Sequence, residues 1–441
     1  MKHGGAGQIG GARGGLRGVA LMLALAAGLA LSGCSSSQKL LGDLLGDTDN
    51  EVLPGKRESV LGPGGAAGAA AVASQPVAIP AAVTNASWPQ PGGKLSNANH
   101  NLALGRPLKK VFTISAASSS GGNLSAPPIV IGGRVYVLGS DGRVGAFSAT
   151  SGGRAWMVSL APKGEDDGGH GGGLCSDGRA LYAATGFGEV VALALSNGAQ
   201  LWRRKLTMPV RAAPVVAGGR IYVRDSGNTL YAISASDGSI LWTHQGDAGS
   251  TALIAPSAPA VASGYVVAPF TSGTLVAFSP QGYSMWSQSL SGVGAIHDIA
   301  ARPVIDGSLV FAASATGSLA AFRLRDGEET WSRELGGRNT PWVAGDYLFH
   351  IAGRRQLVAV EKNTGAIRWS TSLPGGSWSG PVMGGGRLLA VSSKGVLAEI
   401  SPQSGQIMHK TDIGDGSHVQ PVIAAGMLYI LDDDGRLHAF R

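Results

Sequence analysis

The sequence predicts an all-β protein, an eight-bladed β-propeller whose blades are four-stranded and antiparallel. Three observations lead to this expectation. A short phrase that ends in tryptophan recurs roughly every 40 residues, which is the period of a propeller blade. Short alternating apolar runs between glycine turns fill each interval. A strand-like segment before the first complete copy supplies what the last copy lacks.

The recurring phrase contains a Leu or Val, an Ala, a second apolar residue, a glycine turn and then Trp. Because it returns in copy after copy, we interpret the Trp as structural: its ring would pack on the next blade, and its N–H would donate to a backbone carbonyl. Trp342 and Trp378 fall outside the period and are candidates for special contacts. The eight slots are Phe112, Trp156, Trp202, Trp242, Trp286, Trp331, Trp369 and His409.

One copy, residues 211–246, shows its four strands most clearly. Short runs with β-branched and aromatic residues alternate with turns that contain Gly, Asp, Asn or Ser. A single blade buries only part of its two faces, so neighbouring blades must stack around an axis. The expected strands of this copy are 213–217, 220–224, 229–233 and 239–243.

The last copy predicts how the ring closes. It begins at Met427 and stops at Arg441, one strand short of the others. The segment 110–114, with Phe112 in the slot, lies about one period before Trp156. We therefore expect this segment to complete the last blade, which removes the exposed strand edges that promote aggregation.

The first 33 residues are predicted to be a lipoprotein signal peptide. Basic residues precede an apolar stretch at 19–31 that is too short to span a bilayer comfortably. This stretch ends in Leu-Ser-Gly-Cys34, which resembles the lipobox of bacterial lipoproteins and implies cleavage before Cys34 and acylation of that residue, with palmitate among its acyl chains. An ordinary secretory signal is the alternative. Ser35 after the cysteine favours the outer membrane over the inner one.

The segment 34–85 is rich in Gly, Ala and Pro and poor in large apolar residues. Such a composition does not support a core, so we expect a flexible, low-complexity tether between Cys34 and a propeller domain at 86–441. Cys175, in an apolar strand, is expected to be a packed structural cysteine.

The net charge of +7 does not point to nucleic acid, because Lys and Arg are scattered without a run of five. Catalytic patterns are absent as well. The acidic groups at 166–167, 328–329 and 432–434 lie in turns, and we interpret them as solvated turn formers. His170 and His297 lack the spacing of zinc ligands. We expect no enzymatic activity, no metal and no cofactor.

Two resemblances narrow the function. The repeated Ala-x-Ser-x-x-Gly-x-x-x-Trp phrase resembles the docking motif of pyrroloquinoline-quinone-dependent (PQQ-dependent) dehydrogenases, which implies such a periplasmic dehydrogenase as one alternative. The vicinal cysteine pair of those enzymes is missing here. A narrower resemblance is to the BamB family of outer-membrane assembly lipoproteins. It rests on the lipobox, the tether and phrases at 124–128, 186–193, 210–214, 298–304 and 340–346.

The BamB resemblance implies a non-catalytic scaffold lipoprotein of the β-barrel assembly machinery, the Bam complex, on the periplasmic side of the outer membrane. Its implied partners are the periplasmic domains of the barrel-inserting protein, with unfolded outer-membrane proteins as clients, and the propeller would be monomeric within the complex. The implied contact residues are Ala252, Leu253 and Ile254, although the better-studied branch has Arg where Ile254 stands. An ordinary inter-blade loop, and a generic periplasmic scaffold with another partner, remain alternatives.

Overall fold

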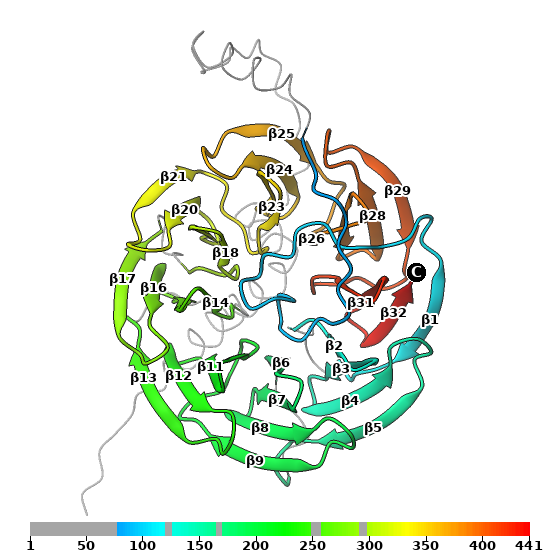
Figure 1. The fold of residues 1–441 in the computed structure, drawn as a ribbon. Coiled ribbons are helices and arrows are strands. Elements are labelled where there is room, and N and C mark those ends of the chain that lie inside the picture. Colours follow the sequence, from blue (N-terminus) through cyan, green and yellow to red (C-terminus); the bar gives the residue numbers. More distant parts are fainter. Residues whose placement is uncertain (1–76, 120–125, 165–169, 248–256, 291–297) are drawn as a thin grey trace, which may run out of the picture. The chain divides into compact units, whose positions relative to one another are not determined.

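The computed structural model describes residues 77–119, 126–164, 170–247, 257–290 and 298–441. These residues form eight four-stranded antiparallel sheets. The sheets stand as blades around a central axis (Figure 1), which confirms the predicted eight-bladed propeller. Within the described ranges, no helix has the length and apolar character that a membrane crossing requires.

The first seven blades are each built from four consecutive strands, with the first strand innermost. Blades 1 to 4 are β2 (Ile129–Ile131), β3 (Arg134–Leu138), β4 (Arg143–Ser148) and β5 (Arg154–Ser159); β6 (Gly172–Ser176), β7 (Ala180–Thr185), β8 (Glu189–Ala194) and β9 (Gln200–Lys205); β10 (Val215–Ala217), β11 (Arg220–Arg224), β12 (Thr229–Ser234) and β13 (Ile240–Gln245); and β14 (Ala260–Ala262), β15 (Tyr265–Pro269), β16 (Thr274–Phe278) and β17 (Ser284–Ser289).

Blades 5 to 8 continue the ring to the C-terminus. They are β18 (Val304–Asp306), β19 (Leu309–Ala313), β20 (Leu319–Arg323) and β21 (Glu329–Arg333); β22 (Trp342–Ala344), β23 (Tyr347–Ala352), β24 (Gln356–Glu361) and β25 (Ile367–Ser372); β26 (Trp378–Gly384), β27 (Arg387–Ser392), β28 (Val396–Ile400) and β29 (Ile407–Asp412); and β30 (Val422–Ala424), β31 (Met427–Leu431) and β32 (Arg436–Phe440) with β1 (Lys110–Ser115).

Blade 8 closes the ring as the sequence predicts. Strand β1 pairs antiparallel with β32, and Phe112 lies opposite Ala439. A hydrogen-bonded chain reinforces the seam: Thr113 Oγ1 lies 3.1 Å from His438 Nδ1, and His438 Nε2 lies 2.8 Å from Asp432 Oδ2. Asp432 is fully buried, so its interpretation as a solvated turn residue was wrong. Its carboxylate is buried because it accepts from His438 and from the Arg436 backbone N–H.

The outermost strands place the slot residues in a constant register. Each slot tryptophan lies opposite the Ala of the recurring phrase, as Trp242 lies opposite Ala232, and a β-bulge follows at once. The small methyl group leaves room for the indole ring. His409 takes the same register position but faces Glu399 and is exposed. Phe112 is half-buried and packs against the core.

Each slot tryptophan joins its blade to the next one. The indole N–H donates to a backbone carbonyl near the last turn of the following blade, at 2.7 to 3.1 Å. The glycine of that turn has a positive φ and lies against the indole ring, as Gly238 lies against Trp202. The acceptors are Leu195, Ala235, Pro280, Leu324, Lys362 and Pro402.

We expect Gly238→Ala to lower the free energy of unfolding by about 3 kcal/mol, because a methyl group would lie 2.6 Å from the Trp202 ring. Gly219→Ala is the matched control, since its φ of +74° is close to the +72° of Gly238 and nothing lies within 4 Å of its added Cβ. The control should lose only about 1 kcal/mol from backbone strain. Urea unfolding of both variants measures the difference, and equal losses would contradict the ring contact.

The segment before β1, residues 77–109, crosses the middle of the ring in Figure 1 and bonds to its innermost strands. We call it the strap. Its residues meet the innermost strands of the blades in ring order, from blade 8 through blade 1 to blade 7. The contacts join Asn85 to Ile423, Trp88 to Val130, Gln90 to Ser176 and Val216, Leu95 to Val261, Ser96 to Ile305, His100 to Trp342 and Leu102 to Met383.

Two tryptophans fix the middle of the strap. Trp88 is fully buried and stacks on Trp342, with ring centroids 6.4 Å apart and planes 10° apart. The strap also reaches further back than expected. Residues 77–85, which the sequence analysis placed in the tether, contact the ring: Val77 is buried, and Asn85 Nδ2 donates to the Ile423 carbonyl at 2.6 Å. These contacts use backbone and amide groups, which leave no periodic signature.

Candidate functional site

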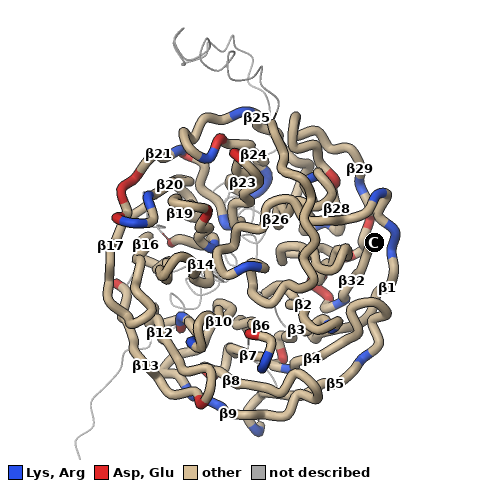
Figure 2. Tube along the Cα trace, viewed as in Figure 1, with Lys and Arg blue, Asp and Glu red and all other residues tan. Residues whose placement is uncertain are grey.

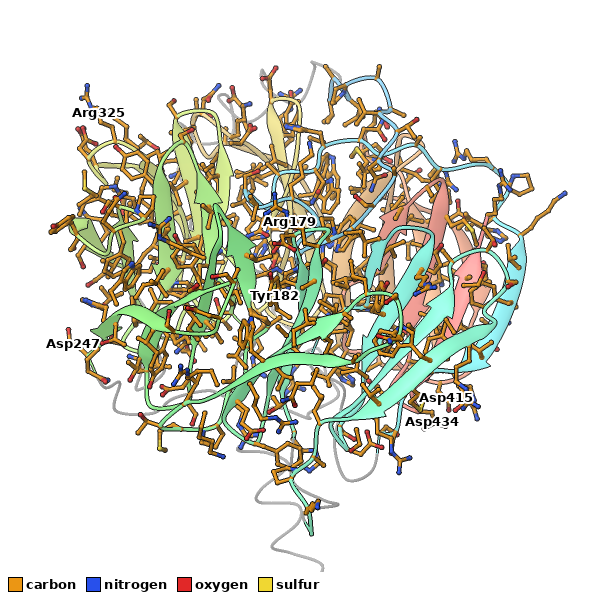
Figure 3. All side chains as sticks on the ribbon, turned by 60° about the horizontal axis from the view of Figure 1, so that its bottom comes forward. Arg179, Tyr182, Asp247, Arg325, Asp415 and Asp434 are labelled. Atoms are coloured by element: carbon orange, nitrogen blue, oxygen red, sulfur yellow. The ribbon has the colours of Figure 1, made fainter. Side chains whose placement is uncertain are left out.

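The channel has two different ends. At the strap end, the strap lies against the turns that follow the innermost strands, as Leu104 lies against Gly385 just after β26. At the opposite end, which we call the cavity end, the chain enters each innermost strand from the preceding blade. In Figure 3 the cavity end is the lower side of the ring, where Asp247, Asp415 and Asp434 lie. The strap end is the upper side, where Arg325 lies.

A small cavity lies at the cavity end, where residues just before the innermost strands converge. Its volume is about 70 Å³. Blades 1, 5, 6, 7 and 8 contribute to it, so it spans the axis of the ring. Its lining is Pro127, Ala300, Arg302, Arg338, Asn339, Thr340, Ser379, Gly380, His418, Val419 and Gln420.

Arg302 is the buried cation of this cavity. It stands two residues before β18, and only 8% of it is exposed. Its Nη2 donates to Oε1 of Gln420, so the side chain reaches from blade 5 to blade 8. Burial lowers the pKa of Arg302 to about 10, which still leaves the guanidinium charged at neutral pH.

Polar groups around Arg302 are held by their own hydrogen bonds. Asn339 Nδ2 donates to the Trp378 carbonyl at 3.0 Å, and its Oδ1 accepts from the Gly380 N–H at 3.2 Å. His418 Nδ1 lies 2.8 Å from Asp433 Oδ2, and this hydrogen bond raises the pKa of His418. The cavity therefore has a fixed polar rim with an excess of basic groups.

Arg302 and Gln420 were not among the predicted site residues. The sequence nevertheless contains a pattern that could have identified them. In most blades a proline stands at or near the start of the innermost strand, so the residues before these prolines can be aligned between blades. The preceding residue is small at Ala213, Ala258 and Gly380, whereas it is large and polar at Arg302 and Gln420. Comparison of these aligned positions would have marked the two residues.

The predicted functional residues lie elsewhere or outside the described part. Cys34 and the segment Ala252, Leu253 and Ile254 are outside the described residues. The slot residues are on the outermost strands, away from the cavity. Cys175 is fully buried, and burial raises the pKa of its thiol, which fits a packed cysteine better than a reactive one.

The described residues do not fit a quinone and calcium site. The cavity, at about 70 Å³, is far smaller than the roughly 300 Å³ or more that organic cofactors occupy. No Asp or Glu is among its described lining residues, whereas calcium requires several oxygen ligands. Across the described ranges, no three His, Cys, Asp or Glu side chains gather as metal ligands would.

The charges of the propeller do not form a single-sign surface. Lys and Arg are scattered along the described chain in Figure 2, with Asp and Glu between them. Several of them pair locally, as Arg436 does with Asp415 and Asp434, and Arg323 with Glu328. Such a distribution lacks the continuous basic stripe that a nucleic-acid surface presents.

Sequence comparison finds relatives of known identity. A family model described as the outer membrane protein assembly factor BamB matches residues 140–371 and 354–441. The BamB protein of Yersinia pestis is 29% identical over 315 residues, which cover 66% of this chain and 80% of that protein. The BamB protein of Escherichia coli K12 is 29% identical over 302 residues, which cover 64% of this chain and 77% of the relative.

Solved structures share the fold. The crystal structure of BamB from Moraxella catarrhalis aligns with a TM-score of 0.68 at 20% identity, over 76% of this chain and 99% of that chain. A europium-containing methanol dehydrogenase aligns with a TM-score of 0.67 at 11% identity, over 85% of this chain and 100% of that chain. At these identities both matches establish the propeller fold alone.

Proposed function

Because the chain belongs to the family of the outer membrane protein assembly factor BamB, we propose that it is a non-catalytic scaffold in outer-membrane protein assembly. The observation that carries this proposal is the family match, which extends from β4 of blade 1 to β32 of blade 8. The cavity end supports it, because the described residues there do not fit the quinone and calcium of the dehydrogenase alternative.

The proposed partner is the periplasmic part of the barrel-inserting outer-membrane protein, and the proposed contact segment is Ala252, Leu253 and Ile254. The first described residue after this segment contacts the cavity end. Ser257 is fully buried, and its Oγ donates to the Ala301 carbonyl at 2.9 Å. Ala301 stands between two cavity residues, Ala300 and Arg302. Ser257, three residues after the proposed contact segment, is therefore anchored beside the cavity.

The proposed location is the periplasmic side of the outer membrane, with acylated Cys34 as the anchor and the residues up to 76 as the tether. Several acyl chains bind a bilayer stably without a spanning helix. The relatives are named as outer-membrane assembly factors, which supports this placement. Cys34→Ser should move the chain from the membrane fraction to the soluble periplasm.

The test is affinity purification of the tagged, full-length chain from membranes of its own host. We expect the barrel-inserting protein to co-purify. Leu253→Asp should reduce its recovery at least tenfold, because a carboxylate would disrupt an apolar contact. Leu201→Asp is the matched control: Leu201 is 57% exposed on outermost strand β9, so recovery should stay within twofold.

Two outcomes would count against the proposal. Equal recovery from Leu253→Asp and the unsubstituted chain would reject the contact segment. Failure to recover any component of the assembly machinery, together with quinone-dependent alcohol oxidation by the purified chain, would reject the scaffold function in favour of the dehydrogenase.

A further inference from the structure

Arg302 differs from the other buried arginines of the described chain because no carboxylate is close enough to affect its pKa. Arg387 forms an ion pair with Glu399. Burial lowers the pKa of Arg224, and the charges of Asp298 and Asp225 oppose this shift. For Arg302, desolvation is the single cause of the lowered pKa, and the neutral Gln420 amide is its side-chain acceptor.

A buried charge without a counter-charge raises the free energy of the folded protein, so its position indicates where an anion would bind. Removing a guanidinium from water costs several kcal/mol unless an anion or a full set of hydrogen bonds replaces the water. Arg302 Nε has no acceptor among the described residues. A carboxylate is the group whose two oxygens match the guanidinium fork.

The cavity beside Arg302 limits the size and the charge of a group that could pair with this guanidinium. Its volume of about 70 Å³ exceeds the roughly 10–15 Å³ that one water needs, so it admits a group the size of a carboxylate. Arg338 and His418 also line it, and no acidic side chain is among its described lining residues. Asn339 and Thr340 add polar atoms to its wall.

We propose that the cavity at the end of the channel opposite the strap is a binding site for a carboxylate group, with Arg302 as its principal ligand. The site is independent of the family assignment, because it is defined by the cavity and the unpaired guanidinium. The carboxylate can belong to a small free anion or to the C-terminus of a polypeptide. The chemistry is the same in both cases, and the probes below separate them.

Calorimetric titration of the full-length protein tests the site with three probes at constant ionic strength in chloride. The probes are sodium acetate, N-acetyl-triglycine with a free C-terminal carboxylate, and the same peptide as its C-terminal amide. We expect both carboxylates to bind and the amide to bind at least tenfold more weakly than the acid peptide. Tighter binding of the acid peptide than of acetate identifies a polypeptide terminus, and the reverse identifies a small anion.

Three substitutions assign the binding to Arg302. Arg302→Met should weaken carboxylate binding at least tenfold, and Arg302→Lys, which keeps the charge but loses the fork, should weaken it about threefold. Arg325→Met is the matched control, because it makes the same charge change at a side chain that is 78% exposed on the other side of the ring (Figure 3), and binding should stay within twofold.

A purely structural arginine would give a different result. If Arg302 served only to hold Gln420, Arg302→Met would lower the unfolding midpoint in acetate-free buffer and leave acetate binding unchanged in the folded variant. We expect the opposite: an unfolding midpoint that is unchanged or raised, and loss of the stabilisation that acetate gives the unsubstituted protein. Equal carboxylate affinities in the unsubstituted protein, Arg302→Met and Arg302→Lys, or no binding to any of them, would overturn the proposal.

Discussion

Arg387→Met is expected to lower the free energy of unfolding by about 3–5 kcal/mol, which is a large part of the stability of an ordinary domain. Arg387 is fully buried at the start of β27 and pairs with Glu399, which is also buried. Its Nη2 also donates to the Gly105 carbonyl of the strap at 2.6 Å. Methionine fills the space but leaves the Glu399 carboxylate buried without its cation.

A second substitution separates the ion pair from simple packing. Blade 8 has Met427 and Ala439 at the positions that Arg387 and Glu399 occupy in blade 7, because Leu389 pairs with Glu399 and Tyr429 pairs with Ala439. Arg387→Met combined with Glu399→Ala thus gives blade 7 the side chains that blade 8 already packs. We expect this double variant to recover to within about 1.5 kcal/mol of the unsubstituted protein.

Urea unfolding of the two variants, followed by circular dichroism, measures both effects. The expected order of stability is the unsubstituted protein, then the double variant, then Arg387→Met. A double variant as unstable as Arg387→Met would mean that the loss comes from the strap contact at Gly105 and not from the unpaired Glu399.

The ring could be predicted from the sequence because it is made of repeated local units. Seven of the eight blades have a small Ala opposite the slot residue. The last turn of blades 2 to 7 has a glycine that lies against the tryptophan of the preceding blade, as Gly282 lies against Trp242. These are short-range requirements of β-turns and of ring packing, so they recur in the sequence with the blade period. The pairing of β1 with β32 followed from the same count.

The strap and the cavity could not be predicted in this way. The strap makes each of its contacts once, through groups such as the buried amides of Gln90, Asn97 and Asn101. Arg302 of blade 5 and Gln420 of blade 8 form a hydrogen bond although they are 118 residues apart in the sequence. Contacts between distant residues that occur once have no period. Alignment of the blades marks Arg302 and Gln420 as unusual residues, but it does not show that they pair with each other. For the same reason Asp432 resembled a solvated turn residue.

Trp88→Ala is expected to cost about 3–5 kcal/mol, because Trp88 is fully buried between the strap and the ring. Its ring stacks on Trp342, and its backbone N–H and C=O both bond to Val130 of β2. Val83→Ala is the control within the strap: Val83 is 49% exposed, so its loss should be at most about 0.5 kcal/mol. Urea unfolding compares the two variants with the unsubstituted chain.

Hydrogen exchange shows which part of the molecule Trp88 supports. If the strap holds the ring through Trp88, Trp88→Ala should speed amide exchange at the innermost strands of all eight blades, because the strap bonds to each of them. Faster exchange limited to Val130 and Trp342 would show instead that Trp88 packs locally and that the other strap contacts hold without it. In the first case the strap is part of the cooperative fold of the propeller.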